Sequence, residues 1–280
     1  MFPFRVSLNA STLFPFRLNV IEQVRVAAEA GYDGIELWMR DIEAYVQNGG
    51  TLRQLKRAVD EAGITFVNAI VFFRWADADE AERRQGFAQA EREMRMLAEA
   101  GCRAIAAPPF GNVEGVTLDE MASRFAELVQ KGRDIGVEPI LEFWGRAKKL
   151  SRLSEAVYVA MESGVSDAKV LLDPFHMHTG GSSVAALNVL NGERIGLVHV
   201  NDYPAVPSRD AITDRDRVFP GDGVAPSAEL AGVLFRIGYR GFLSLELFKE
   251  DYGERSALEV ARHGLEKVRA TYQVFEVRQT

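Results

Sequence analysis

The sequence predicts a single-domain α/β protein, a (β/α)₈ TIM barrel that spans residues 1–280. Short apolar runs typical of strands alternate with longer amphipathic runs typical of helices, and eight such pairs follow one another. Shared among eight units, the 280 residues give about 35 residues per unit, and barrels of this class typically contain ~250 residues. A doubly wound open sheet is the alternative, but no G-x-G-x-x-G motif follows the first strand.

The expected strands are rich in β-branched and aromatic residues. They lack a strict alternation of polar and apolar side chains, which favours a parallel sheet that is buried beneath helices. In chain order the strands are Arg5–Asn9, Gly34–Leu37, Thr65–Phe72, Ala104–Ala107, Glu138–Phe143, Val170–Asp173, Gly196–Asn201 and Leu243–Leu247.

The segments between the strands carry helical signals. Apolar residues recur with the helical period in residues 20–28 and 52–62, and residues 81–100 are rich in good helix formers. Thr117 and Glu120 have the spacing of a capping box, which predicts a helix from there to about residue 135.

Two further features mark the connections. Gly31, Gly63 and Gly101 each end a helical run just before a strand, as a left-handed helix cap does. Residues 202–225 have neither a helical nor a strand period and contain three prolines. A loop of this length in a compact domain is usually functional.

Composition excludes several classes of protein. The net charge of −7 argues against nucleic acid as a partner, because phosphate binding relies on clustered Lys and Arg. The single cysteine, Cys102, suits a reducing compartment and is expected to be a small buried residue rather than a nucleophile. The longest apolar run, residues 64–73, is well short of the ~20 residues of a membrane helix. With no signal peptide pattern either, we expect a soluble cytoplasmic protein without a membrane partner.

Four consecutive strands each carry one metal-binding side chain at or near the carboxyl end, where barrel enzymes have their active sites. These side chains are Glu142, Asp173, His199 and Glu246. Taken singly, each has a structural interpretation, such as a helix cap, an ion-pair partner or a hydrogen-bonded core histidine. Together they would repel unless a cation lay between them, and we expect one divalent ion of Mn, Mg, Co or Zn.

The motifs around these residues resemble the xylose isomerase-like TIM-barrel superfamily of sugar isomerases and epimerases, and the resemblance covers essentially the whole chain. It is carried by Leu-Glu142-Phe, Leu-Asp173-Pro-Phe-His176-Met-His178, His199-Val-Asn-Asp202 and Leu-Glu246-Leu-Phe. Residues 68–73 and 216–223 are similar to the inosose isomerase (2-keto-myo-inositol isomerase) branch. A further Glu that ketose 3-epimerases carry shortly after the first ligand is missing from residues 143–148.

The resemblance implies a role for each site residue. Glu142 and Glu246 would bind the metal and also form the acid/base pair that moves a proton through a metal-bound enediolate, unless both are only ligands. His176 would bind a substrate oxygen, the alternative being a helix cap or a loop contact. Arg217 would lie over the substrate oxygens, the alternative being a solvated charge that pairs within residues 214–217.

The expected function is therefore that of a divalent-metal-dependent isomerase or epimerase of a keto-polyol or ketose, with inosose as one candidate. The main alternative is a dehydratase of an inosose or dehydroshikimate-type substrate on the same metal site. A nuclease related to apurinic endonucleases needs more histidines than the four present, as well as a basic groove. A non-catalytic sugar-binding barrel has no need of two opposed carboxylates.

Trp38 and Trp144 follow strand ends and are the best candidates for pocket walls around a small sugar or polyol. Relatives are often homo-oligomers, but no interface is marked in the sequence.

Overall fold

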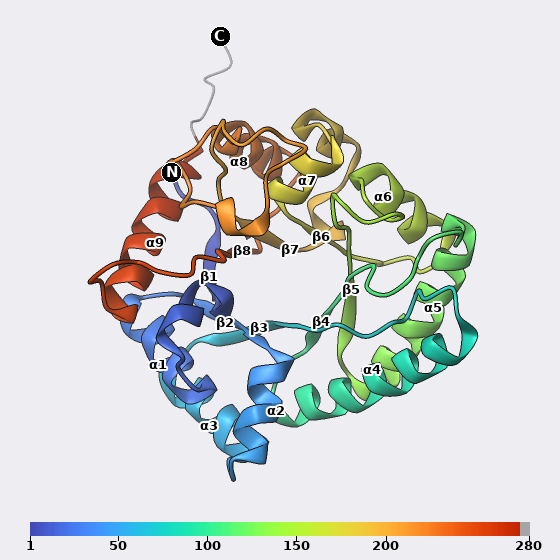
Figure 1. Ribbon diagram of the computed structural model, residues 1–280, viewed down its shortest axis with the longest axis horizontal. Coiled ribbons are helices and arrows are strands. Elements are labelled where there is room, and N and C mark those ends of the chain that lie inside the picture. Colours follow the sequence, from blue (N-terminus) through green and yellow to red (C-terminus); the bar gives the residue numbers. More distant parts are fainter. Residues whose placement is uncertain (275–280) are drawn as a thin grey trace.

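The protein is described by a computed structural model that covers residues 1–274, and it forms one closed parallel barrel (Figure 1). The strands follow one another in chain order, and the last strand closes the barrel by pairing with the first, with Val6 opposite Leu243. The strands are β1 Arg5–Asn9, β2 Gly34–Trp38, β3 Thr65–Ile70, β4 Ala104–Ala107, β5 Glu138–Glu142, β6 Val170–Leu172, β7 Ile195–Val200 and β8 Phe242–Leu245. The predicted (β/α)₈ barrel is confirmed, and residues 275–280 of the expected domain lie outside the described residues.

Helices surround the barrel on its outside (Figure 1). They are α1 Val20–Ala30, α2 Met39–Gln47, α3 Leu52–Ala62, α4 Glu80–Ala100, α5 Leu118–Ile135, α6 Leu153–Glu162, α7 Pro174–Gly180, α8 Ser227–Arg236 and α9 Ala257–Thr271. Short 3₁₀ segments also occur, namely η1 Ala10–Phe16, η2 Val184–Val189, η3 Gly192–Arg194 and η4 Asp214–Asp216.

The helix boundaries follow the sequence signals. Thr117 and Glu120 form the predicted capping box at the start of α5, each side chain accepting a hydrogen bond from the other residue's backbone N–H. Gly101 ends α4 with a φ of 86°, a left-handed conformation that a residue with a Cβ adopts at a cost. Cys102, just after it, is buried as expected, and burial raises the pKa of its thiol to about 12.

Six strands differ from the expected bounds by one or two residues at an end. The third strand ends at Ile70 rather than at Phe72, and the last ends at Leu245 rather than at Leu247. Helix α2 was not predicted: it begins directly after Trp38, without a side-chain cap. Its main amphipathic signal is only Met39 and Ile42, the two buried residues of the helix.

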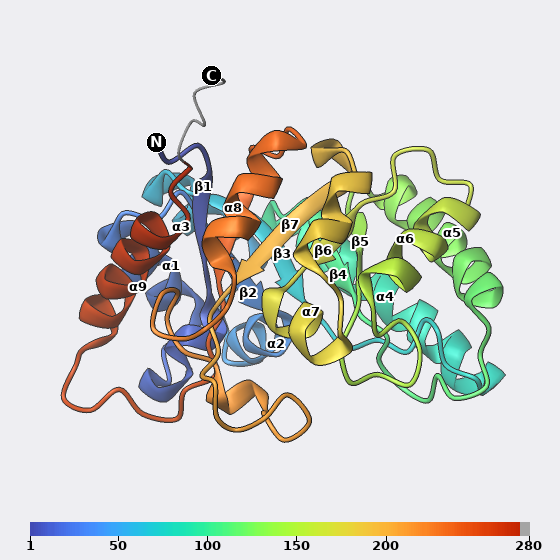
Figure 2. The same ribbon diagram turned by 90° about the horizontal axis from the view of Figure 1, so that it is seen from above.

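The loop of residues 202–225 is held in place by one carboxylate. Asp202 pairs its backbone with Val218 in an antiparallel bridge. Its side chain accepts hydrogen bonds from the backbone N–H groups of Tyr203, Gly221 and Ala225, at 2.7–2.9 Å. The loop, orange in Figure 2, extends from the side of the barrel opposite the chain termini. This is the carboxyl end of the strands, so the loop is fixed over the mouth of the barrel.

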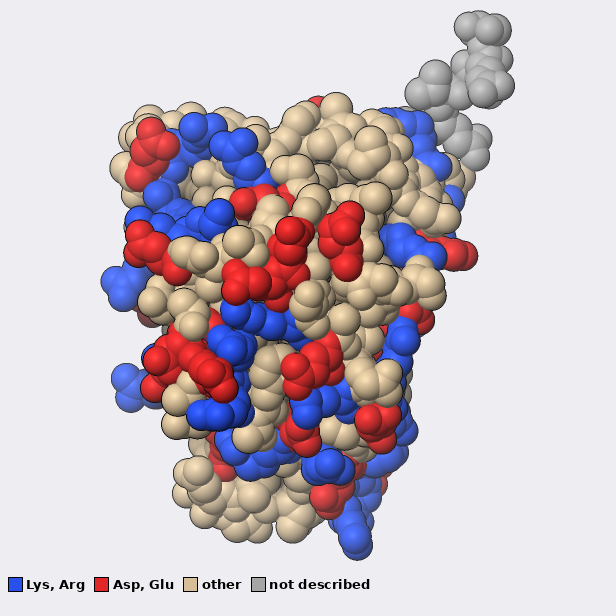
Figure 3. Space-filling view, turned by 90° about the vertical axis from the view of Figure 1, so that its right-hand side faces the viewer, with Lys and Arg blue, Asp and Glu red and all other residues tan. Residues whose placement is uncertain are grey.

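The outer surface around α4, α5 and α6 carries acidic and basic side chains side by side (Figure 3). Lys131 Nζ lies 2.6 Å from Glu91 Oε1, and Arg133 pairs with Asp167. Exposed pairs of this kind contribute little to stability, so the core supplies most of it. Among residues 1–274, no helix is long and apolar enough to cross a membrane.

Candidate active site and metal centre

The four expected ligands all lie at the carboxyl ends of strands. Glu142 is the last residue of β5, and Asp173 follows β6 as the N-cap of α7. His199 is the penultimate residue of β7, and Glu246 directly follows β8. Each is buried, with at most 6% of its surface exposed. Buried charges of one sign require a compensating cation or shared protons.

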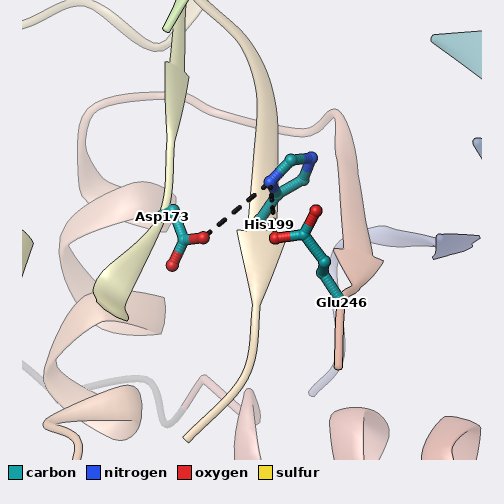
Figure 4. Close-up of side chains that lie close together, drawn as sticks. All are labelled: Asp173, His199 and Glu246. Carbon is teal, nitrogen blue, oxygen red and sulfur yellow. Dashed lines mark ion pairs between the residues drawn. The ribbon is translucent and has the colours of Figure 1, made fainter. Parts of the chain in front are cut away.

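Three of these residues form a compact group. Asp173, His199 and Glu246 each offer one ligand atom, and these atoms lie within 4.8 Å of one another (Figure 4). His199 Nδ1 is 3.2 Å from Glu246 Oε2 and 3.9 Å from Asp173 Oδ2. Although it is buried, Nδ1 makes no well-directed hydrogen bond. A nitrogen without a hydrogen-bond partner between two carboxylates suits a divalent ion.

The other ring nitrogen of His199 faces a carboxylate that the sequence analysis missed. His199 Nε2 lies 3.1 and 3.2 Å from the two oxygens of Glu36, which is fully buried in the middle of β2. Asn9 and Asn68 also donate hydrogen bonds to Glu36, at 3.2 and 2.9 Å. Because a carboxylate only accepts, Nε2 carries a proton and Nδ1 is turned toward Asp173 and Glu246.

These contacts set the charges in the metal-free site. Burial disfavours a charged imidazole, but Glu246 and Glu36 outweigh it and hold the pKa of His199 well above its usual value. Burial likewise opposes ionisation of Glu36, but His199 and the hydrogen bonds lower the pKa of that carboxyl. A divalent ion at Nδ1 therefore takes the place of a proton.

Glu142 differs from the group of three. It is not part of that group, but it lines the same cavity as Glu246. Burial raises the pKa of Glu142 to about 8, with Glu246 and Asp173 adding to the increase and His199 opposing it. At neutral pH Glu142 is therefore largely protonated, a state that suits a general acid.

Arg217 reaches the site from the long loop. Its Nη1 lies 2.6 Å from Asp173 Oδ2 and 2.7 Å from Glu246 Oε2, and the guanidinium stacks 4.5 Å from the centre of the Phe175 ring. It also pairs with Asp214, as the alternative interpretation held. However, Arg217 is only 1% exposed and is not a solvated charge. Burial lowers its pKa, but the neighbouring carboxylates raise it further, so the guanidinium stays charged.

His176 lies in α7 beside these groups. Its Nε2 is 3.5 Å from Arg217 Nη2 and 4.0 Å from Asp173 Oδ2. The cap of α7 is Asp173 rather than His176, so that structural alternative is wrong. Burial lowers the pKa of His176 to about 4, and the ring is neutral at pH 7. A neutral imidazole can donate to or accept from a substrate hydroxyl.

The site opens into a cavity of about 1100 Å³. Its floor carries Glu142, Glu246, His176 and Arg217. Trp38 and Trp144, the expected pocket walls, both line it. Further rings in the lining are Phe14, Phe72, Phe110, Phe175 and Phe248.

The missed residues share a position inside the barrel. Asn9, Glu36 and Asn68 occupy β1, β2 and β3, and all three are fully buried. Asn9 also donates to Glu246, at 3.0 Å. The available signal was a charged residue inside a short apolar strand, Gly34–Trp38, which is rare unless the residue is paired.

Fold and site together define a (β/α)₈ protein with a cluster of carboxylates and an imidazole at the carboxyl ends of its strands. The chain belongs to the xylose isomerase-like TIM barrel family, whose pattern matches residues 24–271. An inosose isomerase of Halalkalibacterium halodurans is 27% identical over 251 residues, which are 87% of this chain and 88% of that enzyme. A 3-dehydroshikimate dehydratase of Pseudomonas putida is 25% identical over 251 residues, 87% of this chain but 38% of that enzyme.

Among solved structures, the IolI protein with bound zinc has the same fold. Its TM-score is 0.87 at 22% sequence identity, and the match covers 97% of this chain and 100% of that one. The two folds therefore match over nearly the whole barrel.

Proposed function

We propose that this protein is a divalent-metal-dependent isomerase or epimerase that transfers a proton next to the carbonyl of a keto-polyol or ketose, with an inosose as the first substrate to test. The observation that carries the proposal is the pair Glu142 and Glu246 on one cavity floor. Burial raises the pKa of Glu142 to about 8, while Glu246 accepts hydrogen bonds from Asn9 and from Arg217. The similarity to an inosose isomerase supports the choice of substrate.

The metal would be held by Asp173, His199 and Glu246, with Glu142 completing the set. The unpartnered Nδ1 of His199 fits this role, as do the carboxylate oxygens around it. A bound divalent ion supplies positive charge where negative charge develops on the substrate oxygens. Mn, Mg, Co and Zn all suit one imidazole with several carboxylates.

The protein's own groups perform the proton transfer. Strands β5 and β8 lie three positions apart around the barrel, so Glu142 and Glu246 approach a substrate from different sides. Glu246 removes the proton next to the carbonyl and Glu142 returns one, or the roles reverse. Arg217 adds charge beside the developing anion, and neutral His176 holds a hydroxyl.

A dehydratase is the second candidate. The same proton removal followed by loss of a β-hydroxyl gives an enone, and Glu142 lines the same cavity, where it could pass a proton to that leaving group. A 3-dehydroshikimate dehydratase of Pseudomonas putida matches this chain over 251 residues, which are 38% of that enzyme. As for its setting, we propose a cytoplasmic enzyme, consistent with its single buried free cysteine.

The test is proton exchange. Mn²⁺-loaded protein is incubated with 2-keto-myo-inositol in D₂O, with the Glu246→Gln variant as control, and NMR follows the protons next to the ketone. We expect deuterium to enter with the native protein and not with the variant. A rearranged inosose indicates an isomerase, whereas an enone band indicates a dehydratase. Native protein that causes no exchange with inosose or with a panel of ketoses contradicts the proposal.

A further inference from the structure

One side of the cavity is built from aromatic rings in mutual contact, here called the aromatic wall. Phe72 lies at its centre, with ring centroids 5.5 Å from Trp38, 5.4 Å from Phe110 and 6.0 Å from Trp144. Phe14 and Phe248 extend the wall beyond Trp38, at 5.0 and 6.0 Å. All six rings line the cavity.

The aromatic wall is not simply the edge of the core. Phe73, Trp75 and Phe143 are core aromatics and are at most 1% exposed. Phe72 and Phe110, in contrast, are only half-buried and face the cavity. Contiguous exposed apolar surface inside a cavity marks a ligand-binding surface, since leaving it in water costs about 25 cal/mol per Å².

The cavity is also too large for a small polyol. Drug-sized ligands fill sites of ~300–1,000 Å³, and the cavity here measures about 1100 Å³. A free keto-polyol is much smaller than a drug-sized ligand. One or two rings are enough to cover the C–H face of a sugar, so most of the aromatic wall would stay uncovered. A second part of the substrate, beyond the reacting sugar, would cover the remaining rings.

The chemistry of that second part follows from the two sides of the cavity. The floor residues Glu142, Glu246 and Arg217 belong to β5, to the end of β8 and to the loop after β7. The aromatic wall comes mainly from residues that follow β1 to β5. A flat aromatic group would pack best against the aromatic wall, because aromatic rings stack edge-to-face and offset at centroid distances of about 4.5–7 Å.

We propose that the substrate is a keto-sugar glycoside with an aromatic aglycone, its sugar on the carboxylate floor and its aromatic group against the aromatic wall. The inference rests on the proposed proton transfer for the reaction, but the recognition of the aromatic group is a separate property. Phe110 is the residue to change, because it lines the cavity and its ring packs against Phe72 and Trp144 of the aromatic wall.

The first experiment compares substrates with the same reacting sugar. Phenyl 3-keto-β-D-glucoside, methyl 3-keto-β-D-glucoside and free 3-keto-D-glucose are given to Mn²⁺-loaded protein in D₂O, and initial exchange rates give kcat/KM. We expect the phenyl compound to exceed the methyl compound by about tenfold or more, through KM, as stacking of ~1.5 kcal/mol implies. Phe110→Ala should remove that preference, so that the phenyl and methyl compounds react with similar kcat/KM.

Phe2→Ala is the matched control. Phe2 is also half-buried against another ring, Phe4, at 5.8 Å, but it precedes β1 at the opposite end of the barrel. This variant should keep the full preference for the phenyl compound. If Phe2→Ala and Phe110→Ala lower the preference equally, loss of fold integrity explains the effect and the proposal is overturned.

The second experiment needs no reaction. Phenyl β-D-glucoside and methyl β-D-glucoside are added to metal-free protein, and saturation-transfer NMR reports which ligand protons touch it. We expect strong transfer to the phenyl protons, lost in Phe110→Ala and kept in Phe2→Ala. If this holds while no ketone undergoes exchange, the proposed reaction fails and the aromatic recognition stands. If exchange occurs at equal rates for phenyl and methyl compounds and Phe110→Ala changes neither, the reaction stands and the aromatic recognition is overturned.

Discussion

Replacing Glu36 with Gln tests how the site holds a metal. The two oxygens of Glu36 accept from Asn9, from Asn68 and from His199 Nε2. Gln keeps the shape but offers one oxygen and one NH₂ group. Whichever way the amide is oriented, its NH₂ group takes the place of one of the two acceptor oxygens and lies opposite a hydrogen-bond donor. Where that donor is His199, the ring is driven to carry its proton on Nδ1, the atom turned toward Asp173 and Glu246.

The magnitude follows from the bond that is lost. A hydrogen bond to a charged group contributes ~1.5–3 kcal/mol, and removing the carboxylate that orients a ligating histidine typically costs 10–100-fold in metal affinity. We therefore expect Glu36→Gln to weaken Zn²⁺ or Mn²⁺ binding by about 10–100-fold, measured at one pH by competition with a chromophoric chelator. ¹⁵N NMR of the His199 ring should show the proton shifted from Nε2 toward Nδ1.

Glu93→Gln is the matched control for removing a buried carboxylate. Glu93 lies in α4, is 3% exposed and accepts from Gln89 rather than from any residue of the candidate site. This variant should bind metal with native affinity. A folded Glu36→Gln protein with native metal affinity and an unchanged His199 NMR signature would refute the reasoning.

Three further predictions concern stability. Burial raises the pKa of Glu93 to about 7 from an ordinary 4.5, so ionisation of this carboxyl destabilises the fold as pH rises. In urea unfolding, Glu93→Gln should therefore raise the free energy of unfolding little at pH 4 and by about 3 kcal/mol at pH 9. The control Glu99→Gln, at a half-exposed side chain, should leave the free energy of unfolding unchanged at both pH values. Asp202→Ala removes the acceptor of three loop N–H groups and should cost about 2–3 kcal/mol, with faster proteolysis between residues 203 and 225 than in Asp222→Ala. In Gly86→Ala the new Cβ would lie 2.6 Å from the backbone carbon of Arg74, so thermal unfolding should reveal a loss of about 1–3 kcal/mol; equal melting temperatures would contradict this.

The fold could be predicted from the sequence because each unit carries its own signals. β1 and β4 begin and end at the expected residues, and the Thr117–Glu120 pair begins α5 as predicted. The missed α2 shows the limit of this approach. Met39, Ile42 and Val46 recur at helical spacing, but over only nine residues, and a helix this short forms because Met39 and Ile42 pack into the core.

The candidate ligands could be found for a related reason. Asp173, His199 and Glu246 each lie at the end of an apolar strand, and the barrel gathers such ends at one mouth. Glu36 could not be placed in the same way. It lies 163 positions from His199 in the chain and on a strand that does not pair with β7, so their contact exists only across the closed interior. The order of residues in the chain does not show which side chains meet across the barrel interior.

The buried position of Arg217 follows from the conformation of its loop rather than from the charges next to it in the sequence. Within residues 214–217 the charges alternate in sign, which on its own favours a solvated run. The outcome was decided elsewhere, because Asp202 pairs its backbone with Val218, next to Arg217, and the guanidinium contacts Asp173 and Glu246. A similar division applies to the cavity: the residues proposed to transfer the proton lie at the ends of β5 and β8, whereas most of the aromatic wall belongs to the first half of the chain. Recognition can therefore change with the loops of the first half while the carboxylate floor stays the same.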